Sequence, residues 1–191
     1  SSAASDVYKR QVIPVFVGFS MLGLFTAISP NFLGDILNIT NKAVIGVMVF
    51  LIFCASTLGQ LLFKSKSDYH ILMLGSGTLI VGVILVGLSI QLESFLILFI
   101  GAIISGFGQA FSFRAGLSTV NAVAPEDKQA EITSTFFTIA YIAISIPVVG
   151  VGLLELGLGI KLAGIVFSII IVILAILSLI LLLANKKKSN S

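Results

Sequence analysis

The chain has 191 residues, of which 58% are hydrophobic and only 10% are charged. Soluble domains carry about 25% charged residues, so this composition excludes a soluble protein and indicates an integral membrane protein. The net charge of +3 does not indicate nucleic-acid binding, because the basic residues are dispersed among loops. With one Cys and one His, the chain offers no intrachain disulfide, no zinc site built on these residues and no Cys–His nucleophile, so we expect neither an enzyme nor a cofactor.

The first eleven residues, SSAASDVYKRQ, are polar and do not continue the apolar pattern that follows. They resemble translated adapter sequence at a broken end of an open reading frame, so we exclude residues 1–11 as a non-native scar. The first methionine, Met21, lies inside the first apolar run, and we therefore expect the chain to be a fragment. A signal peptide cut near Ser29 is the weaker alternative, because Pro30 and further apolar runs follow.

Six apolar runs follow, and each is long enough to cross a hydrocarbon core of about 30 Å as a helix. Barrel strands would alternate polar and apolar residues, which these runs do not do. The sequence predicts an all-α membrane bundle over residues 12–185, with spans at 12–33, 43–63, 71–90, 95–120, 132–154 and 162–184. Residues 186–191 form a basic tail.

The basic residues predict how the bundle is oriented. If the six spans alternate in direction, nine of the eleven Lys and Arg residues lie on one side, and only Lys42 and Lys161 lie on the other. Because basic loops are enriched on the cytoplasmic side, we expect both ends in the cytoplasm. The expected location is the cell (inner) membrane, with the lipid bilayer as the surrounding partner.

Polarity divides the spans into two groups. The third and sixth carry only Ser and Thr, whose hydroxyls can bond to the helix's own carbonyls, so these helices can face lipid. The other four carry larger polar groups, namely Asn31, Gln60, Gln109 and Tyr141. An amide that faces hydrocarbon is costly, so the sequence predicts four inner helices and two peripheral ones.

Two polar stripes repeat at helical spacing. The fourth span carries Ser105, Gln109, Ser112 and Gly116, and the fifth carries Ser134, Thr138, Tyr141 and Ser145. Each stripe either lines a transport path or packs against a neighbouring helix with its hydroxyls bonded to backbone. Tyr141 is favoured as solute-facing, because its ring offers both apolar area and a hydrogen-bond donor.

Other spans carry further candidates. Shared faces occur on the first and second spans: Phe16, Ser20, Ala27 and Asn31, then Phe53, Thr57 and Gln60. Arg114 either attracts an anion, braces a gate or reaches the headgroups, and we favour the headgroups. Pro147 permits a kink, either static or used in rocking, and we favour the static kink.

The stretch 101–154 carries a family resemblance. Its residues are Gly106-Phe107-Gly108-Gln109, Phe113-Arg114-Ala115-Gly116-Leu117, Pro125, Glu131, Ser134, Phe136, Phe137, Tyr141, Ser145, Pro147, Val148, Gly150 and Gly152. This pattern resembles the tenth and eleventh helices of bacterial major facilitator superfamily transporters, often grouped with the multidrug-efflux type. The loop 63–69 departs from the family's basic, glycine-containing motif and keeps only Lys64 and Lys66, so the resemblance does not assign a subfamily.

The resemblance implies the C-terminal six-helix half of a secondary transporter, with the N-terminal half as a missing partner. It implies alternating access to a small-molecule substrate, in a cavity lined by the first, second, fourth and fifth helices of each half. The expected cavity residues are Phe16, Ser20, Asn31, Thr57, Gln60, Ser105, Gln109, Phe137, Thr138, Tyr141 and Ser145. Arg114, Glu131 and Pro147 are the candidates for gating or the cytoplasmic loop.

All acidic residues fall in loops or at helix ends, so none lies mid-membrane to carry a proton. Any coupling acid is therefore expected in the missing half. Phenylalanines and neutral polar groups favour amphipathic solutes, possible cargo for efflux. Two alternatives stay open: a complete six-helix protein that transports as a homodimer, and a non-transporting membrane scaffold or assembly factor.

Overall fold

The computed structural model describes residues 2–62 and 67–189, and the side chains of 12–62 and 67–184. Five long helices follow one another, and no strand occurs in these ranges. The helices are α1 (Ser2–Asn31), α2 (Lys42–Leu61), α3 (Asp68–Leu92), α4 (Phe95–Val123) and α5 (Gln129–Ser189). A π-helical segment, η1 (Phe32–Ile36), follows α1, and a 3-10 turn, η2 (Glu126–Lys128), precedes α5. All five long helices are apolar enough to cross a membrane, so the predicted all-helical membrane bundle is confirmed.

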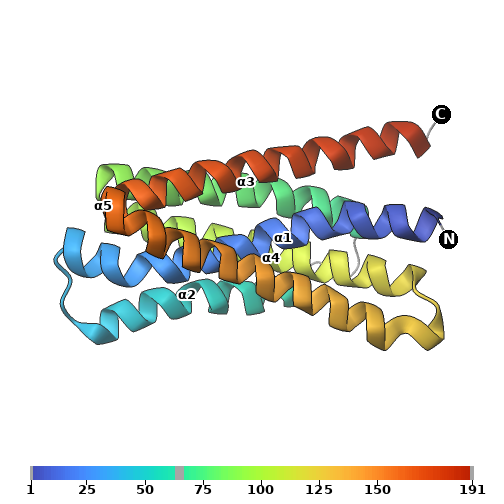
Figure 1. Ribbon diagram of the computed structural model, residues 1–191, viewed down its shortest axis with the longest axis horizontal. Coiled ribbons are helices and arrows are strands. Elements are labelled where there is room, and N and C mark those ends of the chain that lie inside the picture. Colours follow the sequence, from blue (N-terminus) through green and yellow to red (C-terminus); the bar gives the residue numbers. More distant parts are fainter. Residues whose placement is uncertain (1, 63–66, 190–191) are drawn as a thin grey trace.

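Helix α5 doubles back on itself. Its 61 residues would extend about 90 Å in a straight line, far beyond a hydrocarbon core of about 30 Å. The reversal occurs at Gly159, whose φ of 83° and ψ of 164° lie in a region that essentially only glycine occupies. Residues 129–158 (the first arm) and 160–189 (the second arm) therefore run in opposite directions, meeting at Gly159 and diverging toward the other end of the bundle (Figure 1). The hydropathy pattern predicts two separate spans here, 132–154 and 162–184, whereas in the structure a single glycine joins the two arms.

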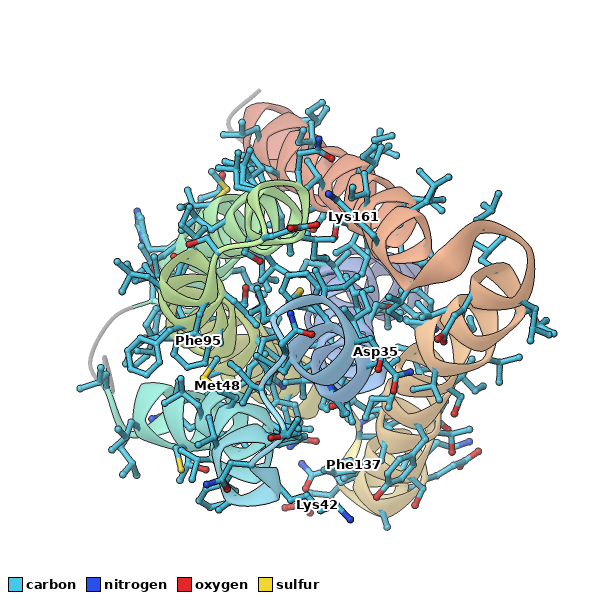
Figure 2. The ribbon with its side chains drawn as sticks, turned by 90° about the vertical axis from the view of Figure 1, so that its left-hand side faces the viewer. Asp35, Lys42, Met48, Phe95, Phe137 and Lys161 are labelled. Carbon is cyan, nitrogen blue, oxygen red and sulfur yellow. The ribbon has the colours of Figure 1, made fainter. Side chains whose placement is uncertain are left out.

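The helices form a bundle with α1 near its centre. α1 packs against α5 and α4, α4 packs against α3 and α2, and α3 packs against α5. Both chain ends lie at one end of the bundle (Figure 1). α2 and the first arm lie along one side, and α3 and the second arm lie along the opposite side, in both views (Figures 1 and 2).

The burial of the helices differs from the predicted division into four inner and two peripheral spans. The most apolar part of α1 is 67% buried and that of α4 is 56% buried, so these two are inner helices as predicted. The same measure is 44% for α3 but only 28% for α2. α2 is thus less covered than a helix predicted to be peripheral, because its outward face meets no other part of the described chain.

The start of α1 also differs from the sequence-based expectation. Residues 2–11 continue the helix, because they contain neither glycine nor proline to interrupt it. Their origin as a scar stays a prediction. At the other end of α1, Pro30 precedes the change to the π-helical segment, because proline removes a backbone donor from the regular helix.

Small residues bring neighbouring helices into backbone contact. A Cβ atom added to Gly23 of α1 would overlap the carbonyl oxygen of Ile144 in the first arm. A Cβ atom on Gly106 of α4 would lie 2.6 Å from the carbonyl oxygen of Ile52 in α2. In lipid, such close approach is a principal source of helix association, because lipid tails are as apolar as the side chains themselves.

Gly23→Ala is expected to destabilise the bundle. The added methyl group meets a backbone oxygen that cannot rotate away, and overpacking of this kind costs about 1–3 kcal/mol. Thermal unfolding of the purified chain, followed by circular dichroism in detergent, should show a lower midpoint. Gly46→Ala is the matched control, because no heavy atom lies within 4 Å of its added Cβ atom. Equal midpoints for the two variants would contradict the close α1–α5 contact.

Candidate functional site

Helix α4 carries a buried amide at its middle. Gln109 is the fifteenth of 29 residues in α4 and is only 2% exposed. A Cβ atom added to Gly18 of α1 would lie 3.2 Å from the Cα atom of Gln109, so α1 approaches α4 closely at this level. The Ser56 hydroxyl of α2 donates a hydrogen bond to Oε1 of Gln109. The amide therefore sits where α1, α2 and α4 meet, with its oxygen satisfied as a buried polar group requires.

The hydrogen bonds extend from Gln109 along α2. Nε2 of Gln60 lies 3.5 Å from the Ser56 hydroxyl oxygen, one helical turn away. Arg114 of α4, half-buried, donates from Nη1 to the backbone carbonyl of Gln60. Because α2 ends at Leu61, this carbonyl is one of those left without a partner inside the helix, and a cation stabilises that end of the helix dipole.

These contacts add two findings to the sequence analysis. Arg114 binds the end of α2, a partner that none of the three sequence-based alternatives named. Ser56 was missed by the sequence reasoning, although it lies four residues before Gln60 and therefore on the same helix face. That spacing was the signal that could have identified it.

Four phenylalanines form a cluster about one helical turn of α4 away from Gln109. Phe113 of α4 lies at ring-centroid distances of 5.5 Å from Phe19 of α1 and 5.9 Å from both Phe136 and Phe137 of the first arm. Aromatic pairs at such distances contribute about 0.5–1.5 kcal/mol beyond burial. Phe137, a predicted cavity residue, is half-buried in this cluster on the first arm (labelled in Figure 2).

The polar stripe of the fifth span forms an exposed face of the first arm. Ser134, Thr138, Tyr141 and Ser145 are all exposed, and Tyr141 is 66% exposed. Thr138 donates to the Ser134 carbonyl at 2.9 Å, and Ser145 donates to the Tyr141 carbonyl at 2.8 Å. The hydroxyls therefore bond to their own helix, as the packing alternative predicts, but the stripe faces outward.

Helix α2 presents a similar face on the same side of the bundle (Figure 1). Thr57 is exposed and donates to the Phe53 carbonyl at 3.0 Å. A shallow hollow of about 380 Å³ surrounds it, lined by Phe50, Phe53, Cys54, Thr57 and Leu58. We call the exposed residues of α2 and of the first arm the open side of the bundle.

Several other predicted site residues lie elsewhere. Ser105 is buried against α3, where a Cβ atom on Gly82 would overlap its hydroxyl, so Ser105 belongs to the α3–α4 contact. Ser20 is buried within α1. Asn31 lies at the end of the bundle remote from the chain termini, where its Nδ2 is 3.4 Å from a carboxylate oxygen of Glu155. The structure therefore does not bring these three residues together with Gln109.

Phe16, a predicted cavity residue on α1, is half-buried. Of the gating candidates, Glu131 is exposed in the first turn of α5. Pro147 is buried in the first arm, and the helix continues through it. Gly159 is the one residue at which α5 departs from helical geometry, so the sharp change of direction does not occur at the proline. Lys64 and Lys66 lie outside the described residues.

The charged groups of the described side chains lie toward the ends of the bundle. Asp68, the first residue of α3, accepts hydrogen bonds from Ser118 at 3.0 Å and Thr119 at 3.3 Å. At the opposite end, Lys161 forms an ion pair with Glu93 at 3.2 Å. No group of three or more His, Cys, Asp or Glu residues that could hold a metal ion occurs in the described part of the chain.

Ser56→Ala is expected to lower the thermal stability of the purified chain. The substitution leaves the buried Gln109 oxygen without its donor, which costs about 1–3 kcal/mol. The neighbouring Thr57→Ala removes a hydroxyl that is exposed and bonded to its own helix, so its unfolding midpoint should stay close to that of the unmodified chain. If both variants unfold alike, the Ser56–Gln109 bond does not contribute to stability.

Comparisons with known proteins give one result. A family model described as Major Facilitator Superfamily matches residues 12–191. No curated protein and no solved structure matches. The match covers α2 to α5 in full and residues 12–31 of α1, and it leaves out the first eleven residues.

Proposed function

This chain belongs to the Major Facilitator Superfamily, a family of membrane transporters, and we propose that it forms one of the two bundles of a secondary transporter that works by alternating access. The solute is a small amphipathic molecule, and the direction of transport is efflux. The second bundle covers the open side, and the solute passes between the two bundles near Gln109 and Tyr141.

The difference between the two sides of the bundle supports this proposal. Within residues 160–184, where the structure describes the side chains of the second arm, the exposed ones are aliphatic, among them Leu162, Ile169, Ile173, Ile176, Leu177 and Ile180. The first arm also exposes aliphatic side chains, such as Ile142, Val149 and Leu153, but adds a row of hydroxyls together with the Tyr141 ring, and α2 adds Thr57. The Tyr141 hydroxyl makes no hydrogen bond within the described part of the chain, unlike those of Thr57, Thr138 and Ser145. Lipid chains match an aliphatic surface but offer no partner to this hydroxyl, so the second arm suits lipid and the open side suits a protein or a wet cavity.

The buried groups next to α2 and the first arm support a neutral or amphipathic solute. Gln109 lies at the middle of α4 and carries an uncharged amide that is bonded to Ser56 of α2. The Phe19–Phe113–Phe136–Phe137 cluster supplies apolar area beside it. Arg114 is the nearest cation on α4, and its guanidinium is already engaged at the end of α2.

A second copy of this chain is the rival occupant of the open side. Saturable uptake of a solute by the purified chain alone in liposomes would favour that rival, because it would show that the chain needs no different second bundle. A scaffold without transport activity predicts no solute movement in any preparation.

Tyr141→Ala and Gln109→Ala are each expected to weaken transport. The assay is accumulation of a panel of amphipathic dyes in cells that express the chain together with its second bundle. Loss of one hydrogen-bonding partner at a buried site costs about 1–3 kcal/mol, so the apparent affinity should drop by roughly ten-fold or more.

Ile176→Ala is the control for these variants, because it truncates an exposed side chain of the second arm on the opposite side of the bundle. Its transport should stay close to normal. Thermal unfolding of the same preparations separates a binding role from a packing role. Unchanged affinity in both the Tyr141 and the Gln109 variant would remove these residues from the site.

We also propose that both chain ends face the cytoplasm of a cell in whose inner membrane the protein lies, as the distribution of basic residues indicates. Single cysteines replace Thr40, in the loop after η1, or Asp127, beside the start of α5, in a Cys54→Ala background. Both positions are exposed and lie at opposite ends of the bundle. A membrane-impermeant maleimide added to intact cells should label position 40 and should label position 127 only after permeabilisation. The reverse pattern would overturn the proposed orientation.

A further inference from the structure

An apolar groove runs between α3 and the second arm, on the side of the bundle opposite the open side. It has a volume of about 340 Å³, and its lining includes Val83, Gly87 and Gln91 of α3 and Ile165, Ser168 and Ile173 of the second arm. Gly87 makes the groove possible, because it has no side chain where the two helices face each other. The Ser168 hydroxyl donates to the Gly164 carbonyl at 2.7 Å, so the groove wall offers almost nothing to a polar ligand apart from the Gln91 amide near the end of α3.

The length of the groove matches half of a membrane. Its lining extends over residues 83–91 of α3 and 165–173 of the second arm, which corresponds to about 12 Å along each helix. Half of a hydrocarbon core is about 15 Å. The groove starts near the end of the bundle at which α3 stops and the second arm begins, so it lies within a single leaflet.

The groove is narrow. Divided by its length, the volume gives a mean cross-section of about 28 Å². A helix with its side chains is about 10 Å across, which corresponds to a cross-section of about 80 Å². A single extended hydrocarbon chain therefore fits within the groove, whereas a helix would lie across its open mouth.

Charges of both signs lie at the mouth of the groove. Lys161 precedes Ile165 by four residues and therefore continues the same stripe of the second arm. Its Nζ atom lies 3.2 Å from Oε1 of Glu93, the residue that ends α3, and the two side chains are 38% and 50% exposed. Lys161 is seen near the end of α3 in Figure 2. A half-exposed ion pair contributes little to stability, so both groups are free to accept an additional partner.

We propose that this groove is a binding site for one glycerophospholipid whose headgroup carries both a phosphate and a primary ammonium group. One acyl chain lies in the groove. The Lys161 ammonium donates hydrogen bonds to the phosphate, and the Glu93 carboxylate accepts one from the lipid ammonium. Two observations together indicate this class of ligand: the apolar groove is about as long as one leaflet is deep, and an accessible Lys–Glu pair lies at its mouth.

The headgroup decides which lipid is retained. Any lipid offers an equally apolar chain, and an acyl chain loses nothing by leaving the bilayer for an apolar groove. An anionic lipid without an ammonium group brings its negative charge next to Glu93. A quaternary ammonium has no proton to donate to that carboxylate, so the ethanolamine headgroup is preferred over choline and glycerol.

Native mass spectrometry of the detergent-purified chain tests the proposal. The chain is incubated with an equimolar mixture of phosphatidylethanolamine, phosphatidylcholine and phosphatidylglycerol that share the same acyl chains. We expect one phosphatidylethanolamine to be retained in preference to the other two. Equal retention of the three lipids, or preference for phosphatidylglycerol, would overturn the proposed headgroup recognition.

Two kinds of variant separate the chain from the headgroup. Gly87→Leu fills the groove, and its Cβ atom fits, because the nearest atom, Cβ of Ser168, would be 3.4 Å away. Its retention of every lipid should fall. Lys161→Gln and Glu93→Gln should each reduce the preference for phosphatidylethanolamine by up to about five-fold, the upper range for a half-exposed charge contact.

Gly77→Leu is the matched control on the same helix. No heavy atom lies within 4 Å of the Cβ atom added at Gly77, and the residue lies outside the groove. Lipid retention should be unchanged in this variant. If Gly87→Leu and Gly77→Leu retain lipid equally, the groove is not the site. The Lys161 and Glu93 variants test the same conclusion at exposed positions, where the substitution is not expected to prevent folding.

A second copy of the chain is the alternative occupant of the groove. If the unmodified chain forms a dimer and Gly87→Leu dissociates it, the groove binds a second copy and not a lipid.

Discussion

Helices inside a membrane gain little from burying apolar side chains against one another, because the lipid is equally apolar. The bundle therefore depends on contacts at which backbones approach closely enough for dispersion forces to act. Gly82 and Gly75 of α3 bring α4 into contact at Ser105 and Ser112, and Gly23 brings α1 against the first arm. These contacts lie at several levels of the bundle and fix α1 and α4 at its centre. Everything described for the open side and for the groove follows from what these contacts leave uncovered.

The polar groups at the junction of α1, α2 and α4 attach α2 to the bundle and also lie next to the proposed solute path. Ser56 satisfies Gln109, and Arg114 satisfies the end of α2, so both bonds tie α2 to α4. α2 has an uncovered outward face, and this makes the same bonds the principal polar attachment of a half-exposed helix. A solute or a second bundle that competed for Gln109 would therefore act directly on the attachment of α2. Such a competitor would change the packing of α2 at the same time as it binds.

The sequence predicted the helices well and their neighbours less well. Hydropathy and length locate the apolar spans, because the bilayer itself sets both quantities. The burial of α2 could not be predicted, because it depends on whether another part of the chain covers that helix. Ser105 and Gln109 differ by about 40° around the helix axis, enough for one to meet α3 and the other α2. The turn at Gly159 gave no clear signal, since Gly157 and Gly152 are equally glycines and only the tertiary contacts of the two arms select the position.

The hydroxyls of the open side carry their hydrogen-bond partners with them. Thr57, Thr138 and Ser145 each bond to a carbonyl one turn earlier in their own helix, so none of them loses its bond when its surroundings change. Transfer of such a surface from water to protein or to lipid costs far less than transfer of an unpartnered hydroxyl. The free energy of these three hydroxyls therefore shows almost complete indifference to whether water, protein or lipid surrounds them. A face that must be covered and uncovered repeatedly needs this indifference, because two arrangements can interconvert easily only when neither is much lower in free energy than the other.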